Sequence, residues 1–416
     1  MPCANDSDIL IQCLQLFLIS FQSGKKTDAW AKSRVDEAPQ AAERVLKLMM
    51  DNERIEPDTL SYQGVLEAWA QSGKQDSLER VKQIYDHMHS LRDSGKNIKP
   101  SVRTANAIVH AHAKRAAAIT YQYDPASFEK AYKCAEDAHG ILKEMKQRFA
   151  ETNDPDDQPD VMTYTSVMDA YARVGNYKAT QQAELLMREL KNEYEKTRNQ
   201  KLRPNYRTYT SLVTAWSRTR SHESPGRVEQ LLMEMGDDPV TMPNTRTYTS
   251  VIQCWAKSKD ATKAKRALKI LREMKDKFKE TNNDEVRPNI ITYNAAIDAC
   301  ARCQGNSEQQ TEALKIAFAI SKAIDADPFV QPNSTTFVTL LNVAAFLLPA
   351  GTERNSVASA VFEKAKKAGL VEASTIKSLR KAVDGEVFQQ LLECVVDRNG
   401  GADLSEIPAA WSKNVQ

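Results

Sequence analysis

Cysteine and histidine side chains could in principle give this 416-residue chain a metal site. Cys300 and Cys303 form a CxxC pair, but no second pair follows, and a structural zinc site needs four ligands. His110 and His112 lie two residues apart, which points their rings to different faces of a helix and prevents chelation. We therefore expect no catalytic residue, no metal site and no cofactor, and we expect that the protein is not an enzyme.

A different chemistry, hydrogen bonding to a ligand, is available at two polar positions that recur along the chain. Hydroxyl and amide side chains both donate and accept hydrogen bonds, but the same residue types also cap helix starts, so both roles stay open. The first position follows an aromatic residue in most copies and is occupied by Gln63, Asn106, Thr165, Thr210, Thr249, Asn294 and Val338. The second position follows a recurring Pro and is occupied by Ser101, Asp160, Asn205, Asn244, Asn289 and Asn333.

A positive charge recurs eight residues beyond the first polar position. The whole chain is nearly balanced, with 57 Lys and Arg against 55 Asp and Glu, so this recurrence is not a consequence of composition. It predicts a track that contacts phosphates, while the alternative is that these cations stabilise helix C-termini. The aligned residues are Lys32 in a partial copy, then Gln71, Lys114, Arg173, Arg218, Lys257 and Arg302.

Three further arginines, Arg103, Arg207 and Arg246, each lie two residues after the residue that follows the repeat Pro. A guanidinium plane can stack on a nucleic-acid base, and it can equally remain in solvent. The sequence favours neither role for these three side chains.

All these positions belong to a unit that occurs seven times. In each copy apolar residues follow at the spacing i, i+3, i+4, i+7, and a second set with the same spacing comes after it, so each copy predicts two helices. One helix pair cannot bury both of its apolar stripes, and neighbouring pairs must stack. The units begin at Pro57, Pro100, Pro159, Pro204, Pro243, Pro288 and Pro332, which lie 39 to 59 residues apart.

The sequence therefore predicts an all-α solenoid of about seven helix-turn-helix hairpins over residues 57–370. Residues 27–56 predict a partial repeat whose first helix lacks its usual start, and residues 1–26 do not fit the pattern. Residues 371–416 are expected to form capping helices and a short tail.

Smaller features also follow from the sequence. Gly73, Gly175 and Gly305 are expected to end first helices in the left-handed conformation. An insertion near residues 115–130 is expected to be a surface loop, and several second helices are expected to project as long polar extensions. Seven Cys without regular spacing argue for a reducing compartment, and no apolar run is long enough to span a membrane.

The repeat resembles the pentatricopeptide repeat over about residues 57–370. The segments TYNAAIDACAR (292–302) and TYTSVMDAYAR (163–173) are similar to the first helix of that family, although the spacing between copies is longer and less even than the family's unit. The resemblance implies a right-handed superhelix that binds single-stranded RNA, with one repeat for each base, and it is consistent with how proteins read unpaired RNA.

In that family, the two polar positions of successive repeats meet and grip one base, so the resemblance also implies a sequence preference. Read parallel to the chain, the core would be 5′-N-U-A-A-A-Y-3′, with Gln63 and Ser101 outside the family's pattern. The implied readers are Asn106 with Asp160 for uracil, Thr165 with Asn205, Thr210 with Asn244 and Thr249 with Asn289 for adenine, and Asn294 with Asn333 for a pyrimidine. The implied backbone contacts are Lys114, Arg173, Arg218, Lys257 and Arg302.

The partner implied by this resemblance is single-stranded RNA, together with RNA-processing or translation factors. We expect a monomer in a mitochondrion or plastid by family resemblance, without a membrane partner, although no clear targeting segment is present. The first rival hypothesis is a tetratricopeptide-like protein scaffold that does not bind RNA. The second is a metal-dependent ribonuclease, for which the residues after Leu370 are too few.

Overall fold

The computed structural model describes residues 38–51, 56–74, 76–120, 125–236, 238–392 and 407–415. These residues form eighteen α-helices, two short 3-10 helices and no strand, which confirms the predicted all-α fold. The chain divides into two compact units, residues 1–215 and 216–416. The atypical segment 1–26 and the start of the partial repeat, including Lys32, lie outside the described residues.

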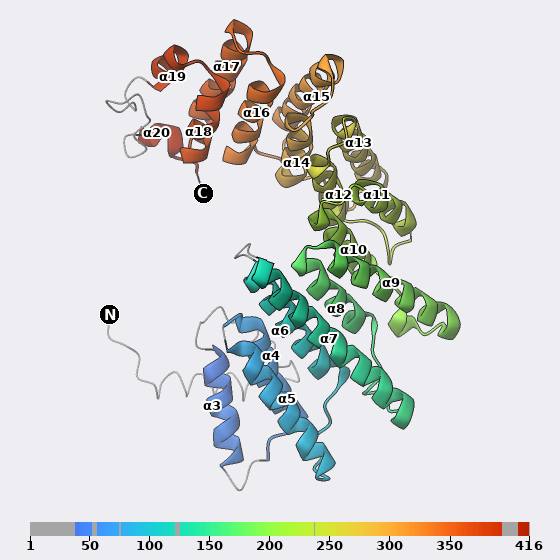
Figure 1. Cartoon of the computed structure of the whole chain (residues 1–416). Helices are drawn as coiled ribbons and strands as arrows, with labels where there is room; N and C mark the ends of the chain where they lie inside the picture. The colour runs from blue at the N-terminus through green and yellow to red at the C-terminus, as the bar shows by residue number, and fades with distance from the viewer. Residues whose placement is uncertain are drawn as a thin grey trace, which may run out of the picture. The chain divides into compact units, whose positions relative to one another are not determined.

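The first unit consists of helical hairpins in which each first helix contacts the first helix of the next hairpin and its own second helix (Figure 1). Its first helices are α4 (Thr59–Ser72), α6 (Val102–Thr120) and α8 (Val161–Val174), and its second helices are α5 (Ser77–Asp93), α7 (Pro125–Thr152) and α9 (Tyr177–Thr197). Helix α3 (Ala38–Met50) contacts α4 as the second helix of the partial repeat. The 3-10 helix η1 (Gln200–Leu202) follows α9, and α10 (Tyr206–Thr219) begins in this unit and ends in the next.

The second unit repeats the arrangement, and its row of first helices continues into the C-terminal region. Along this row α12 contacts α14, α14 contacts α16, and α16 contacts α18, while the short α20 packs on α17. The row comprises α12 (Thr245–Lys257), α14 (Ile290–Ala301), α16 (Ser334–Leu347) and α18 (Ala373–Ala382). The other helices are α11 (Ser224–Met235), α13 (Lys263–Thr281), η2 (Asp284–Val286), α15 (Ser307–Asp325), α17 (Thr352–Ala368), α19 (Gly385–Leu392) and α20 (Ala409–Ser412).

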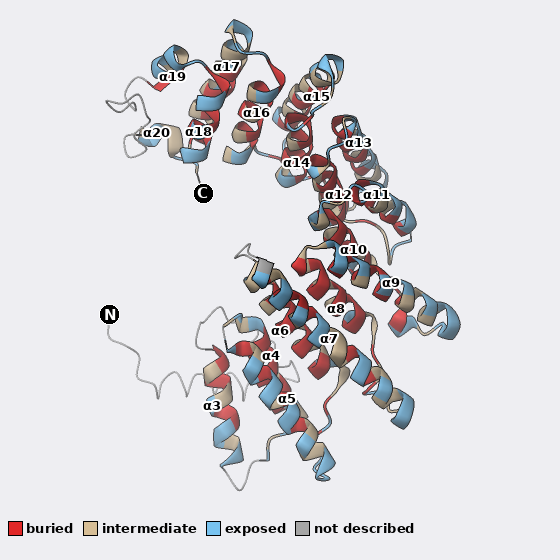
Figure 2. Ribbon diagram, in the orientation of Figure 1, coloured by how far each residue is buried: buried red, intermediate tan, exposed pale blue. Residues whose placement is uncertain are grey.

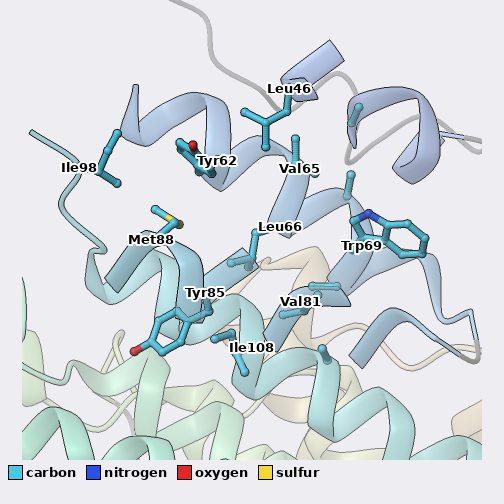
Figure 3. Close-up of a cluster of buried hydrophobic side chains, with 14 residues drawn as sticks. Leu46, Tyr62, Val65, Leu66, Trp69, Val81, Tyr85, Met88, Ile98 and Ile108 are labelled. Carbon is cyan, nitrogen blue, oxygen red and sulfur yellow. The ribbon is translucent and has the colours of Figure 1, made fainter. Parts of the chain in front are cut away.

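The apolar stripes of the first helices form the core, as their spacing predicts. In every copy the residues at i, i+3, i+4 and i+7 are buried, from Tyr62 in α4 to Ala344 in α16. Figure 3 shows the N-terminal part of this core, where Leu66 and Trp69 of α4 lie among side chains from α3, α5 and α6. Burying a side chain such as Leu66 stabilises the fold by about 1.5–3 kcal/mol. A single hairpin could not bury the apolar residues on both of its faces, so the neighbouring hairpins are needed.

Two of the three predicted glycine helix ends are confirmed. Gly73 and Gly175 follow α4 and α8 with φ of 66° and 76°, in the left-handed region. The prediction for Gly305 is wrong, because α14 already ends at Ala301, its cap Arg302 has a φ of −92°, and Gly305 does not have a positive φ. The chain then turns into α15 through Asn306, whose side chain accepts the amide hydrogen of Gln309 at 2.9 Å, so no left-handed glycine is needed.

The predicted loop at residues 115–130 is also wrong for the part that the structure describes. Helix α6 continues to Thr120, and α7 begins at Pro125 and runs for 28 residues. The alanines after Arg115 favour helix, and Pro is well tolerated in a first helical turn, so the insertion mainly lengthens two helices.

The predicted extensions of the second helices α7, α9 and α13 are confirmed, since the last turns of these helices are exposed or half-buried (Figure 2). All three helices end in the same way. A terminal threonine donates its hydroxyl to the carbonyl four residues earlier, and the next residue is left-handed and ends the helix. The three left-handed residues are Asn153, Arg198 and Asn282, with φ of 53°, 51° and 49°. The hydroxyl of Thr152 donates to the carbonyl of Arg148 at 2.8 Å, that of Thr197 to the carbonyl of Glu193 at 2.7 Å, and that of Thr281 to the carbonyl of Lys277 at 2.8 Å. This shared ending returns the chain to the next Pro-Asx start.

Two glycines of the first unit allow a matched test of the backbone argument. Gly73→Ala should lower the free energy of unfolding by about 1 kcal/mol, because alanine is strained at positive φ. Gly140→Ala, within α7 and with open space around its Cα, should instead raise it by about 0.5–1 kcal/mol. Urea unfolding followed by circular dichroism measures both, and equal shifts for the two variants would contradict the helix-end assignment.

Candidate nucleic-acid interface

Within each of the two units, the polar position of a first helix lies close to the start of the next repeat. The side chains there are largely covered: Thr165 and Thr249 are 8% exposed and Asn294 is 7% exposed. Each follows the first residue of a buried apolar stripe and lies at the edge of that stripe. Each can therefore reach polar atoms of the following repeat.

Two of the predicted pairs are in direct contact, one in each unit. In the first unit Asn106 Nδ2 donates to Asp160 Oδ1 at 3.4 Å. In the second unit Asn294 Nδ2 donates to Asn333 Oδ1 at 3.0 Å. In both asparagines the remaining side-chain oxygen is buried and has no hydrogen-bond partner among the described residues, which is unusual for a buried acceptor.

Two other pairs are connected through the first-turn threonine of the next helix. Thr249 Oγ1 lies 2.7 Å from Thr292 Oγ1, and Thr292 in turn donates to Asn289 Oδ1 at 3.1 Å. The first unit has the same arrangement, with Thr165 and Thr208 hydroxyls 2.9 Å apart and Thr208 donating to Asn205 at 3.4 Å.

The remaining predicted pair, Thr210 and Asn244, is divided between the two units. Thr210 Oγ1 donates to the Tyr206 carbonyl at 2.7 Å, and Asn244 caps α12. Their relation to one another stays a prediction.

In most copies the residue after the Pro is a helix cap, so the structural role that the sequence left open is present. Asp160, Asn244, Asn289 and Asn333 have extended backbones, and the Oδ1 atom of each accepts the amide hydrogen of the threonine three residues later. Because Oδ1 is used in this way, each side chain has one polar atom left. That atom is Oδ2 of Asp160 and Nδ2 of the asparagines, and none has a hydrogen-bond partner among the described residues.

Outside the predicted pattern, Gln63 donates to Glu67 at 3.0 Å within α4, which agrees with a structural role for this residue. Glu67 also receives two hydrogen bonds from Arg103, at 2.6 and 3.0 Å. Arg207 lies over the ring of Tyr206, with 5.8 Å between guanidinium carbon and ring centroid. Of the three arginines whose role the sequence left open, Arg246 forms no ion pair in the part of the chain that the structure describes.

The predicted backbone cations come together within each unit. Loss of hydration lowers the pKa of Lys114, and the nearby Arg173 lowers it further. In the second unit loss of hydration lowers the pKa of Lys257, followed by the charges of Arg220, Arg218 and Arg302. Clustered like charges attract anions, and Arg220 adds one cation that its position outside the repeat had hidden from sequence reasoning.

Acidic neighbours partly neutralise this track. Arg173 pairs with Asp169 at 2.8 Å and Arg302 pairs with Asp298 at 2.8 Å, each within one helix turn. Lys114 donates to the Gln71 carbonyl at 2.6 Å. Lys257 forms no ion pair in the described part of its unit, so it is the cation best placed to meet an anion.

In both units the residue three positions before the polar position is exposed, and the sequence analysis identified only the arginines among these residues. All seven residues of this register are exposed: Leu60, Arg103, Met162, Arg207, Arg246, Ile291 and Thr335. Three of them are large and apolar, with exposed fractions of 47% for Leu60, 39% for Met162 and 57% for Ile291. Their signal in the sequence was an apolar residue in a first helical turn that does not belong to the buried stripe.

The candidate metal ligands are parts of the core. Cys300 is fully buried and donates to the Ala296 carbonyl at 3.3 Å, as expected for a residue of the apolar stripe. Burial raises the pKa of this thiol to about 12. No cluster of three His, Cys, Asp or Glu side chains suited to a metal ion occurs among the described residues. Within the same residues, no helix has both the length and the apolarity needed to cross a bilayer.

Comparison of the sequence with protein-family models finds a match to a repeat domain. The profile of the pentatricopeptide repeat domain matches residues 147–193, 230–302 and 277–345. No curated protein matches the chain.

Among solved structures, the crystal structure of the pentatricopeptide repeat protein PPR10 from maize is 20% identical with a TM-score of 0.43, covering 90% of this chain and 49% of PPR10. PPR10 in complex with an 18-nt psaJ RNA element is 18% identical with a TM-score of 0.35, covering 86% of this chain and 46% of that one. This chain thus spans about half the length of those proteins. Residues 147–193 and 230–345, whose helix pairs and capped starts are described above, thus match the pentatricopeptide repeat domain.

Proposed function

We propose that this protein binds single-stranded RNA selectively and reads the core 5′-N-U-A-A-A-Y-3′, one base for each repeat. The observation that carries the proposal is the recurring contact between the polar residue of one repeat and the cap of the next. Each such contact leaves a single polar atom on the cap, beside a row of exposed side chains. Each of these caps has one polar atom without a hydrogen bond to the described residues. A series of such equivalent sites is suited to a ligand that is a polymer of similar units, such as a strand of nucleotides.

The atom left on each cap determines which base it can bind. Asp160 Oδ1 accepts from the helix, so the remaining carboxylate oxygen is an acceptor and requires a base with a ring N–H, such as uracil at N3. An asparagine cap retains its amide NH₂, a donor, and requires an unprotonated ring nitrogen, such as adenine N1 or cytosine N3. The caps Asn205, Asn244, Asn289 and Asn333 therefore favour adenine or cytosine.

The size of the partner residue then separates purines from pyrimidines. Thr165, Thr210 and Thr249 are short and leave room for the larger adenine, whereas Asn106 and Asn294 reach further and suit a pyrimidine. The buried, unpartnered oxygens of Asn106 and Asn294 support this role, because a base or a bridging water could supply the missing donor. A bound base would have to displace the present contacts between each asparagine and its cap.

The remaining features support binding along the strand. Arg218, Lys257 and Arg302 would contact phosphates in the second unit, and Lys114 and Arg173 in the first. The exposed Met162 and Ile291 would pack against base faces, since stacking does not depend on base identity.

We place the protein, as a monomer, among the factors of organellar RNA processing, stability or translation, in a mitochondrion or plastid. It would act by occupying a transcript, alone or with processing or translation factors. Because the helix row could also hold a peptide, indifference to RNA sequence and to salt would favour a protein scaffold.

The first prediction exchanges one atom on a cap. Asp160→Asn should change the preferred second base from uracil to cytosine, because the free acceptor becomes a donor while the helix cap is retained. Competition binding with 5′-NUAAAC-3′ and 5′-NCAAAC-3′ RNA measures this preference, which we expect to be about 5- to 150-fold in each direction, from ~1–3 kcal/mol per mismatch.

Asp58→Asn is the matched control for this change. Asp58 caps α4 through the same contact, with Ser61 N–H donating at 2.8 Å, but it belongs to no assigned reading pair. It should leave the base preference unchanged. An Asp160→Asn protein that still prefers uracil would contradict the assignment.

The second prediction concerns the cations. Binding that involves about six of them should give a slope near −4 for log affinity against log salt, at ~0.7 per phosphate contact. Lys257→Ala with Arg218→Ala should reduce the slope by about 1.4 and weaken binding to all sequences alike. Lys315→Ala with Lys322→Ala removes the same charge from exposed positions of α15 and should leave the slope unchanged; equal effects of the two double variants would argue against a phosphate track.

A further inference from the structure

A cavity of about 520 Å³ in the second unit lies among the starts of three successive repeats. The caps Asn244 and Asn289 line it, together with Gln331 just before the following start. Thr249 and Asn294, the first members of the reading pairs, do not line it. The cavity is large enough for a small polar ligand, since such pockets measure ~300–1,000 Å³.

One wall of the cavity includes the exposed aromatic ring of Phe329. Phe329 is 73% exposed, and the guanidinium carbon of Arg287 lies 3.7 Å from its ring centroid. A phenylalanine this exposed is unfavourable in water, while a cation beneath one face leaves the opposite face available for stacking. Planar heterocyclic bases are the ligands that stack on such a platform.

The position of Phe329 is fixed by its own loop. Asp327 Oδ1 accepts the Phe329 backbone N–H at 3.1 Å, and Asp327 Oδ2 accepts the hydroxyl of the buried Tyr293 at 3.3 Å. Across the cavity, Thr245 Oγ1 donates to the carbonyls of Glu285 and Arg287, both at 2.8 Å, which ties η2 to the start of α12. Both walls are therefore held in place before any ligand arrives.

The polar groups on the cavity wall match the parts of a ribonucleotide. Arg246 forms no ion pair among the described residues and can receive a phosphate. Glu285 presents an exposed carboxylate, which can accept a hydrogen bond from a ribose hydroxyl. Asn289, which also lines the cavity, provides an amide donor. A peptide could contact the Phe329 ring and the charged side chains. It has no single unit that combines a phosphate, a ribose hydroxyl and a base, which Arg246, Glu285 and Asn289 could bind together.

We propose that this cavity is a ribonucleotide subsite that holds the third adenine of the bound core. Its base stacks on the free face of Phe329, its phosphate lies at Arg246, and its 2′-hydroxyl donates to Glu285. The inference rests on the proposed function. It adds a stacking platform outside the row of first helices. It also adds a means of distinguishing RNA from DNA, since only RNA carries the 2′-hydroxyl that Glu285 would bind.

The test measures the affinity of the full chain for labelled 5′-NUAAAC-3′ RNA by fluorescence anisotropy. Phe329→Ala should weaken binding about 5- to 150-fold, as expected for the loss of one base stack. Phe346→Ala, an exposed aromatic residue of α16 that does not line the cavity, should bind like the unmodified protein. Circular dichroism verifies that both variants keep their helices.

A second series replaces one ribose at a time with deoxyribose. Deoxyribose at the third adenine should weaken binding by about tenfold, as for a hydrogen bond to a charged group, with little effect elsewhere. Glu285→Gln should reduce this difference. Arg246→Ala should weaken binding of every strand.

The outcomes separate the two proposals. If the unmodified protein prefers the core sequence but the Phe329, Arg246 and Glu285 variants bind as it does, the subsite is overturned and the cavity is left to a peptide ligand, while base reading stands. If the unmodified protein has no affinity for the RNA, both proposals fail.

Discussion

The hydrogen bond between the Asx side chain that follows most repeat prolines and the third amide of the following helix is the interaction on which the rest depends. It begins the first helices of successive repeats at equivalent residues, for example Asp160 to Thr163 and Asn289 to Thr292. A cap of this kind contributes about 1 kcal/mol, yet its larger effect is geometric. It fixes the direction of the side chain and uses one of its two polar atoms, so the other atom is presented in a defined chemical form.

This constraint also explains how the repeats tolerate uneven length. Repeat starts lie 39 to 59 residues apart, but the additional residues lengthen helices rather than separate the caps from the preceding first helix. In α9 and α13 the threonine end and the 3-10 turn return the chain to the next proline, with Leu202 and Val286 buried as anchors. The contacts of Asn106 with Asp160 and of Asn294 with Asn333 consequently persist across loops of different length.

Much of the fold could be predicted from the sequence because it depends on local chemistry. The buried stripes, the left-handed ends at Gly73 and Gly175 and the capped starts each follow from residues within one turn of helix. The structure departs from the sequence reasoning where two local signals compete. At Gly305 the cap of Asn306 made a left-handed glycine unnecessary, and after Arg115 the helix-favouring alanines outweighed the apparent insertion.

The sequence positions of the candidate site could be predicted from the repeat, but the contacts that these residues make between repeats could not. Spacing alone aligned Thr249 with Asn289, but the threonine Thr292 that lies between them belongs to the next helix and is brought there by packing. The same is true of Arg220, which lies outside the repeat register but near Lys257, and of the pairing of Arg103 with Glu67. Such contacts depend on the stacking of hairpins, which sequence periodicity predicts only in outline.

The central claim is that a cap uses one atom for its helix and offers the other to the Watson–Crick edge of a base. The most direct measurement is the affinity for core RNA in which 1-deazaadenine or 7-deazaadenine replaces the adenines one at a time. The account predicts a loss of about tenfold for each 1-deaza substitution, because the asparagine amide then has no ring nitrogen to bind, and no loss for 7-deaza. Equal affinity for 1-deaza and unmodified RNA would contradict it.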